Sequence, residues 1–205
     1  MINELSNLKT TIKNQNSRLT NKVKPIKIME KIDQLASAIK EFDSKYVLEK
    51  SPNISVLNDI TEKQIHFHIN KLHLNLDKDE KPLVIVNTKK GVRLYGFSGF
   101  VLTNKKIHFS LTKRFYFASF LPLSEKPRQL KLEAIDSFQI GEHDSCFGTT
   151  YVGHDLVINE KPLGLVRLGF GFVYDEEALV YINDLSKFLF EKGFLKSSPI
   201  EYQWQ

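Results

Sequence analysis

Two segments in which apolar and polar residues alternate constrain the fold of this chain more than any other feature. Residues 93–103 and 106–113 have the period of two that is typical of half-buried β-strands, and a short polar turn at 103–106 joins them. They belong to a half of the chain that is rich in such segments and ends in one amphipathic helix. This order predicts a sheet-rich domain closed by a helix, and by itself it indicates no chemistry.

Seven strands are predicted in the second part of the chain. They cover residues 83–87, 93–103, 106–113, 115–121, 129–140, 151–158 and 163–172. A break near Glu133 could divide the fifth of them, and turn residues such as those at 159–162 separate neighbouring strands. Short strands at this regular spacing are typical of an antiparallel barrel or sandwich. Asp175 is predicted to cap the closing helix and Gly193 to end it.

The first part of the chain has helical periodicity. Apolar residues recur every three or four positions over 5–26 and again over 28–46, and Pro25 separates the two stripes. A third helix is predicted to start at Asp59, where Glu62 has the spacing of a capping box. The first two stripes could pack as a helical hairpin, or pair with copies in another subunit as a short coiled coil.

A charged, proline-containing segment at 77–82 is expected to be the boundary between the two parts. The predicted domains are therefore a helical region over 1–80, a sheet domain over 81–196 and a tail over 197–205. The predicted fold class is α+β, with an N-terminal α-helical region followed by an antiparallel β-barrel or sandwich that a C-terminal α-helix caps.

Composition favours a cytoplasmic protein. Cys146 is the single cysteine, so no internal disulfide can form. The N-terminus lacks the apolar run of a signal peptide, and no apolar stretch reaches the roughly 18 residues of a membrane span. The net charge is +5, and residues 5–29 carry six basic side chains and no acidic one. We interpret this arm as a solvated helix face, because its basic residues are too sparse for a typical nucleic-acid contact.

Three segments of the sheet region carry motifs of a known family. Residues 99–109 have the sequence Gly-Phe-Val-Leu-Thr-Asn-Lys-Lys-Ile-His-Phe, residues 120–124 Phe-Leu-Pro-Leu-Ser and residues 134–140 Ala-Ile-Asp-Ser-Phe-Gln-Ile. With the closing helix, these segments resemble the bacterial pleckstrin-homology-like domains, whose superfamily includes the GRAM domains, over about 83–195. The resemblance implies a PH-like barrel or sandwich. Members of the family are mostly non-catalytic modules that bind lipids, peptides or proteins, and some form homo-oligomers.

His143, Cys146 and His154 are the nearest approach to a reactive cluster in the sequence. They could supply three ligands to a metal ion, or a histidine could activate Cys146 as a nucleophile. Their spacing matches no recognised zinc motif, and no oxyanion donor accompanies the cysteine. We therefore expect no cofactor and no catalysis, and an enzyme centred on residues 143–155 is the third alternative.

Four basic residues lie at the turn and at the end of the predicted 93–113 hairpin, namely Lys105, Lys106, Lys113 and Arg114. In lipid-binding relatives, basic residues on this hairpin contact head-group phosphates, so the resemblance implies an anionic-lipid site here. Alternatively, these side chains only keep sheet edges from pairing with other strands. The leading prediction is a non-enzymatic binding or scaffold protein that acts through a protein partner or self-association. A sheet edge, or the groove between it and the last helix, could take an extended peptide; anionic-lipid binding is the alternative.

Overall fold

The computed structural model describes residues 33–71, 74, 76–87, 99–111, 127–143, 153–166 and 175–200. The chain divides into two compact units, Met1–Leu35 and Ala36–Gln205. In the first unit only residues 33–35 are described, and they are helical.

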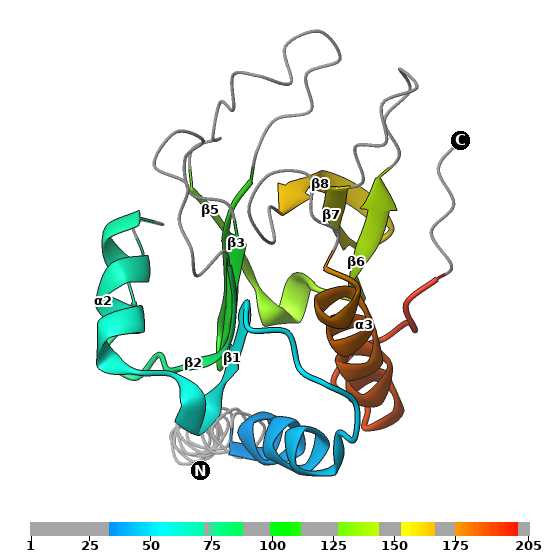
Figure 1. The fold of residues 1–205 in the computed structure, drawn as a ribbon, viewed down its shortest axis with the longest axis horizontal. Coiled ribbons are helices and arrows are strands. Elements are labelled where there is room, and N and C mark those ends of the chain that lie inside the picture. Colours follow the sequence, from blue (N-terminus) through cyan, green and yellow to red (C-terminus); the bar gives the residue numbers. More distant parts are fainter. Residues whose placement is uncertain are drawn as a thin grey trace, which may run out of the picture. The chain divides into compact units, whose positions relative to one another are not determined.

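Two antiparallel sheets form the framework of the second unit (Figure 1). The first has the order β1-β2-β3-β4-β5, with bounds Ile54–Val56, Pro82–Asn87, Gly99–Thr103, Lys106–Ser110 and Arg128–Lys131. The second has the order β6-β7-β8, with bounds Phe138–His143, Gly153–Ile158 and Lys161–Val166. Within each sheet every strand pairs with the next along the chain, so both sheets are meanders. In the part of the chain that is described the two sheets remain separate ladders, and no closed barrel forms.

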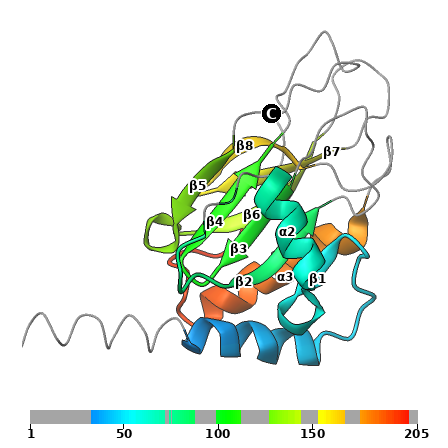
Figure 2. The ribbon, with the colours of Figure 1, turned by 90° about the vertical axis from the view of Figure 1, so that its left-hand side faces the viewer.

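Helix α2 (Glu62–Lys71) belongs to the layer on one face of the first sheet (Figures 1 and 2). Alternation along the strands turns Ile85 and Val101 to this face, where they are buried with Leu74. Three partly buried residues pack against them, Ile60, Ile69 and Leu76. The alternate residues of the same strands, such as Val84 and Phe100, are also fully buried and point to the opposite face. The first sheet is therefore covered on both faces.

The start of α2 differs from the prediction by two residues. The Thr61 hydroxyl accepts the Gln64 backbone N–H at 3.3 Å, and Gln64 Oε1 accepts the Thr61 backbone N–H at 2.8 Å. This reciprocal pair is a capping box, so Thr61 and Gln64 have the roles predicted for Asp59 and Glu62. Asp59 instead lies in the 3-10 turn η1 (Leu57–Asp59).

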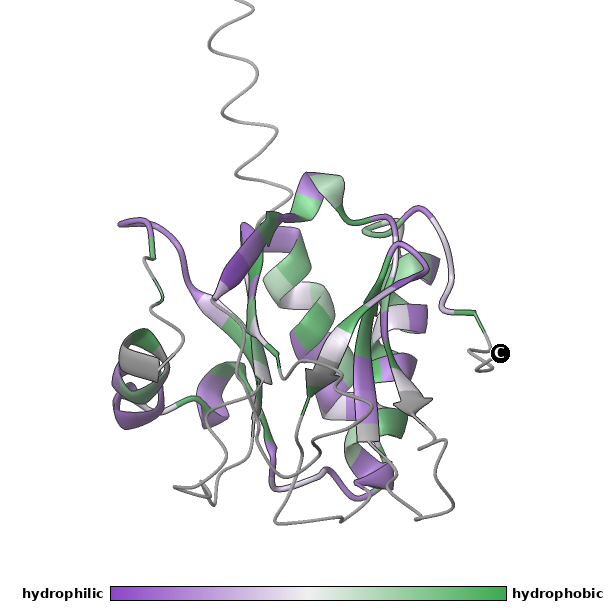
Figure 3. Ribbon diagram, turned by 90° about the horizontal axis from the view of Figure 1, so that it is seen from above, coloured by the Kyte–Doolittle hydropathy of each residue, from purple (hydrophilic) through white to green (hydrophobic). Residues whose placement is uncertain are grey.

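The closing helix α3 (Glu176–Glu191) begins and ends where it was predicted to. The Asp175 side chain accepts the Ala178 backbone N–H at 2.9 Å, and Gly193 follows the helix with a φ of +78°. The buried residues of α3 recur at intervals of three and four; they are Ala178, Tyr181, Ile182, Leu185, Ser186 and Leu189. Figure 3 shows the resulting alternation of hydrophobic and hydrophilic residues along the helix. Of the described helices, none is both long and apolar enough to cross a bilayer.

Residues 33–45 are helical, within the stripe predicted over 28–46. Strand β1 was not predicted, because three residues are too few to show a period. It precedes residue 81, where the sheet domain was expected to begin, and pairs with β2. The break predicted near Glu133 is present as the 3-10 turn η2 (Leu132–Ala134), which separates β5 from β6. The strand predicted over 115–121 lies outside the described residues.

Candidate functional site

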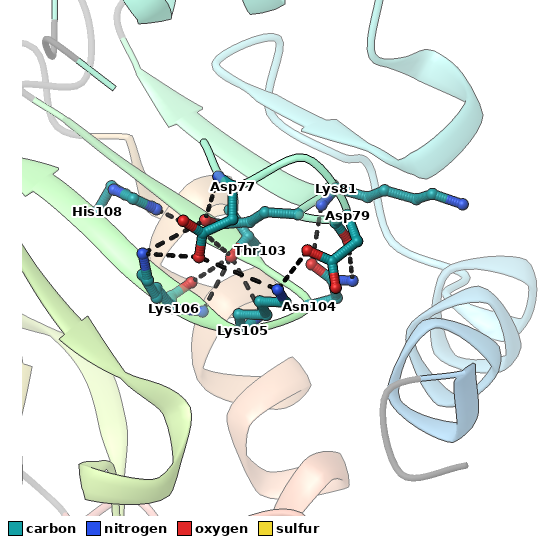
Figure 4. Close-up of polar contacts among 9 residues, drawn as sticks. Asp77, Asp79, Lys81, Thr103, Asn104, Lys105, Lys106 and His108 are labelled. Atoms are coloured by element: carbon teal, nitrogen blue, oxygen red, sulfur yellow. Dashed lines mark hydrogen bonds and ion pairs between the residues drawn. The ribbon is translucent and has the colours of Figure 1, made fainter. Parts of the chain in front are cut away.

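Lys105 and Lys106 lie at the turn between β3 and β4, and an acidic turn that precedes β2 faces them (Figure 4). Lys105 Nζ lies 2.5 Å from Asp79 Oδ1, and Lys106 Nζ lies 3.2 Å from Asp77 Oδ2. The Asp77 interaction is the main reason that the pKa of Lys106 is raised, and the Lys105 interaction is the main reason that the pKa of Asp79 is lowered. Both ammonium groups are therefore compensated within the chain.

Glu80 is the buried centre of this cluster. Its side chain is 0% exposed and accepts hydrogen bonds from the Thr103 hydroxyl at 2.6 Å and the Asp77 backbone N–H at 3.1 Å. His108 Nε2 lies 2.6 Å from its Oε1 atom, and Lys106 Nζ lies 3.6 Å from its Oε2 atom. Burial raises the pKa of Glu80, but the hydrogen bonds from His108, Thr103 and Asp77 together outweigh burial, and the pKa is lowered. The carboxylate is thus a satisfied buried charge.

Asn104 joins the same two turns through backbone groups. Its side-chain Oδ1 accepts the Lys81 N–H at 2.8 Å, its Nδ2 donates to the Asp79 carbonyl at 3.1 Å, and its own N–H donates to the Lys81 carbonyl at 3.0 Å. We call the set made by Asp77, Asp79, Glu80, Lys81, Thr103, Asn104, Lys105, Lys106 and His108 the 77–108 clasp. It fastens the connection between α2 and β2 to the β3–β4 hairpin.

Two of the four residues of the predicted lipid site, Lys105 and Lys106, are already ion-paired in the 77–108 clasp. A head-group phosphate that bound Lys105 or Lys106 would compete with the carboxylates of Asp77, Asp79 and Glu80. The other two residues of that prediction, Lys113 and Arg114, lie outside the described residues. Anionic-lipid binding therefore stays a prediction, and the geometry of the described lysines adds no support to it.

A second polar cluster surrounds the start of α3. The Asp175 carboxylate accepts hydrogen bonds from the Ser51 hydroxyl at 2.6 Å and from Asn53 Nδ2 at 2.7 Å, besides the Ala178 N–H. The Asp175 backbone N–H donates to His154 Nε2 at 3.2 Å. Serine, aspartate and histidine are the residue types of a catalytic triad, but here the serine hydroxyl donates to the carboxylate and not to the imidazole. The arrangement caps the start of α3.

The predicted reactive cluster is only partly described. His154 is buried, with its Nε2 atom engaged by Asp175 as above. His143 is the last residue of β6 and pairs with Gly153, one position away from the Glu142–His154 pair. Cys146 lies outside the described residues. Across the ranges that the structure describes, no three His, Cys, Asp or Glu side chains are placed to hold a metal ion.

The edge of β6 that faces α3 has its backbone groups engaged. The Asn183 side chain accepts the Ile140 N–H and donates to the Ile140 carbonyl, both at 2.9 Å. The Ser186 hydroxyl donates to the Phe138 carbonyl. A peptide that paired with β6 beside Ile140 would have to displace the Asn183 amide.

Sequence reasoning missed the most exposed hydrophobic residues of the described chain. Val47 and Leu48 are 92% and 57% exposed, and they are separated from the end of the 33–45 helix by Tyr46. The Tyr46 ring lies before them, 4.7 Å from the Tyr181 ring, and Lys50 lies after them in ion pairs with Asp43 and Asp59. The signal was in the sequence, because Val47 and Leu48 continue past the last position of the helical stripe. We call these two residues the 47–48 patch.

Comparison with protein-family models, with curated proteins and with solved structures found no match to this chain.

Proposed function

We propose that this chain is a non-enzymatic protein-binding module, in which a PH-like domain over 81–196 supports a contact surface centred on the 47–48 patch. Two meanders, β2 to β5 and β6 to β8, followed by the single helix α3, support the PH-like part of the proposal. This is the order of elements that the sequence resemblance implies. Strand β1 and helix α2 are additions to that arrangement.

The exposure of the 47–48 patch carries the proposal. Single exposed hydrophobic residues are ordinary on protein surfaces, but two adjacent aliphatic side chains at 92% and 57% exposure keep an apolar surface in water. The segment is held on both sides, by the ring contact of Tyr46 with Tyr181 and by the ion pairs of Lys50. A contact surface that is already ordered loses little conformational entropy on binding.

The internal roles of the ionisable groups support a function without catalysis. Glu80 and His108 are hydrogen-bonded to each other inside the 77–108 clasp. At the start of α3 the Asp175 carboxylate accepts from Ser51 and Asn53, and His154 Nε2 accepts from the Asp175 backbone N–H. Each of these buried groups has a structural contact that substrate chemistry would have to break. Groups of this kind stabilise a fold when they are fully hydrogen-bonded.

Photochemical crosslinking tests the proposal. Val47 is replaced in the full chain by a benzophenone-bearing residue, and irradiation is carried out in the cells that produce the protein. A matched control carries the same residue at Glu133, which is also exposed but lies in η2. The proposal predicts a discrete protein adduct from position 47 and none of the same mass from position 133. If position 47 yields no adduct, or only those that position 133 yields, the proposal is wrong.

A further inference from the structure

We propose that the partner of the 47–48 patch is a second copy of this chain, bound about a twofold axis that passes close to Val47. The inference rests on the proposed function and names the partner of the same surface. Its basis is the charge pattern around the patch, together with the way in which the surrounding ion pairs are arranged.

The segment around Val47 is complementary to itself. Lys45 precedes Val47 by two positions and Glu49 follows it by two, so the charges on the two sides are opposite. In a twofold contact the same surface is used by both copies, and a residue on one side of the axis faces the residue on the other side. An antiparallel approach centred on Val47 therefore places Lys45 of each copy opposite Glu49 of the other. The two valines and leucines then lie in the centre, with charged pairs at the rim, which is the usual anatomy of an interface.

The rim charges are available for such a contact. The Lys45 side chain is 71% exposed, and Glu49 is exposed as well. Within the chain Lys45 pairs with Glu41 at 2.8 Å. Glu41 also receives Lys192 Nζ at 3.1 and 3.0 Å, one distance to each carboxylate oxygen. Lys45 can therefore turn to Glu49 of another copy while Glu41 keeps a cation beside it.

The size of the contact predicts a weak dimer. Stable complexes bury about 800 Å² on each partner, which is more than a surface of five residues can supply. The rigid attachment of the segment favours binding, because Tyr46 and Lys50 hold it on either side. We expect the dimer to have a dissociation constant in the micromolar range, about 1–500 μM.

Sedimentation velocity over that concentration range tests the inference on the full chain. The variants are Lys45→Glu, Glu49→Lys and the double variant with both changes, and Lys40→Glu is the control. Lys40 is an exposed residue of the helix that ends at Lys45, so its substitution makes the same change in net charge as Lys45→Glu but outside the proposed contact. Circular dichroism and thermal unfolding confirm that each variant is folded.

The expected result is a concentration-dependent dimer of the wild type. Because of the twofold axis, each single reversal creates two like-charge pairs, and we expect a rise in the dissociation constant of about tenfold or more. The double variant should recover the wild-type value, and Lys40→Glu should keep it. A wild type that stays monomeric throughout, or a dimer that neither reversal weakens, overturns the inference.

Failure of this inference can be separated from failure of the proposed function. If the chain is monomeric but position 47 crosslinks to another protein, the twofold contact is wrong and the protein-binding proposal stands. If a dimer forms that is insensitive to Lys45 and Glu49 and position 47 yields no adduct, both are wrong. A dimer that the double charge reversal rescues supports both.

Discussion

The Glu80 carboxylate and the His108 imidazole lie 2.6 Å apart, and their side chains are 0% and 5% exposed. They come from segments 28 residues apart, one in the turn before β2 and one in the centre of β4. A buried carboxylate is stable only when hydrogen bonds replace its lost hydration. Thr103, His108 and the Asp77 N–H supply them. The pair therefore anchors the connection after α2 to the first sheet.

Substitution of Glu80 by Gln should destabilise the fold. The variant loses the negative charge that His108, Thr103 and the Asp77 N–H all approach, and we expect a loss of about 1–3 kcal/mol in the free energy of unfolding. Urea denaturation followed by circular dichroism measures it. The matched control is Asp79→Asn, which removes an ion pair whose carboxylate is 75% exposed and should leave stability close to the wild type. If Glu80→Gln and Asp79→Asn lost equal amounts of unfolding free energy, the buried Glu80 carboxylate would be no more important for stability than the exposed Asp79 carboxylate, which would contradict the prediction.

The same pair predicts an acid-sensitive contribution to stability. The pKa of Glu80 is lowered in the folded chain, so the unfolded chain binds its proton more tightly. The stabilisation that ionised Glu80 gives the fold is therefore complete above the pKa of Glu80 in the unfolded chain, about 4.3. It is lost as the pH falls through the lower pKa of Glu80 in the folded chain. The difference in unfolding free energy between wild type and Glu80→Gln should be widest above about pH 5 and shrink at lower pH. Denaturation curves recorded across this range check it, and a difference that did not change with pH would argue against a charged Glu80.

Substitution of Asp175 by Ala should weaken the attachment of α3. It removes the acceptor for the Ala178 N–H and leaves the Ser51 hydroxyl and the Asn53 amide without their partner. We expect a loss of about 1–3 kcal/mol, since a helix cap and buried hydrogen bonds are lost together. Thermal unfolding measures it against Glu176→Gln, an exposed acidic residue at the next position. Two variants of equal stability would show that Asp175 has no more than a surface role.

Substitution of Asn183 by Ala should open the edge of β6. The Ile140 N–H and carbonyl both lose their side-chain partner, and hydrogen exchange at the Ile140 amide should become faster. An open strand edge also favours pairing between chains, so we expect more aggregation on heating. Mass spectrometry of exchange in peptides that contain Ile140 provides the readout, with the exposed Lys187→Gln of the same helix as control. Unchanged exchange at Ile140 would mean that something other than Asn183 protects this edge.

Local features of the fold could be predicted from the sequence. The cap at Asp175, the end of α3 at Gly193 and the strand–turn–strand of β3 and β4 depend on residues close together in the chain, and all of them are confirmed. The N-cap of α2 was predicted at Asp59 because Asp59 and Glu62 have capping-box spacing, but Thr61 and Gln64 have the same spacing and form the box. Spacing alone does not distinguish the two.

The candidate sites depended on contacts between distant residues, and these could not be predicted. Lys105 and Lys106 were considered as an anion site because the family resemblance implied one, and their ion pairs with Asp79 and Asp77 join turns that are far apart in the chain. Those carboxylates belong to the 77–82 segment, which was expected to be a linker. The 47–48 patch was missed for a different reason, because Val47 and Leu48 lie just past the helical stripe predicted over 28–46 and were assigned to no element.

Hydroxyl-radical footprinting of Val47 and Leu48 tests the central claim most directly. Side-chain oxidation is measured in the cells that produce the protein and in the purified full chain at low concentration, with the exposed Ile200 as reference. The account predicts that oxidation of Val47 and Leu48 falls in the cell relative to the dilute chain while that of Ile200 changes little, because a partner covers the patch. Equal oxidation of the patch in both conditions would show that it remains in water and would contradict the account.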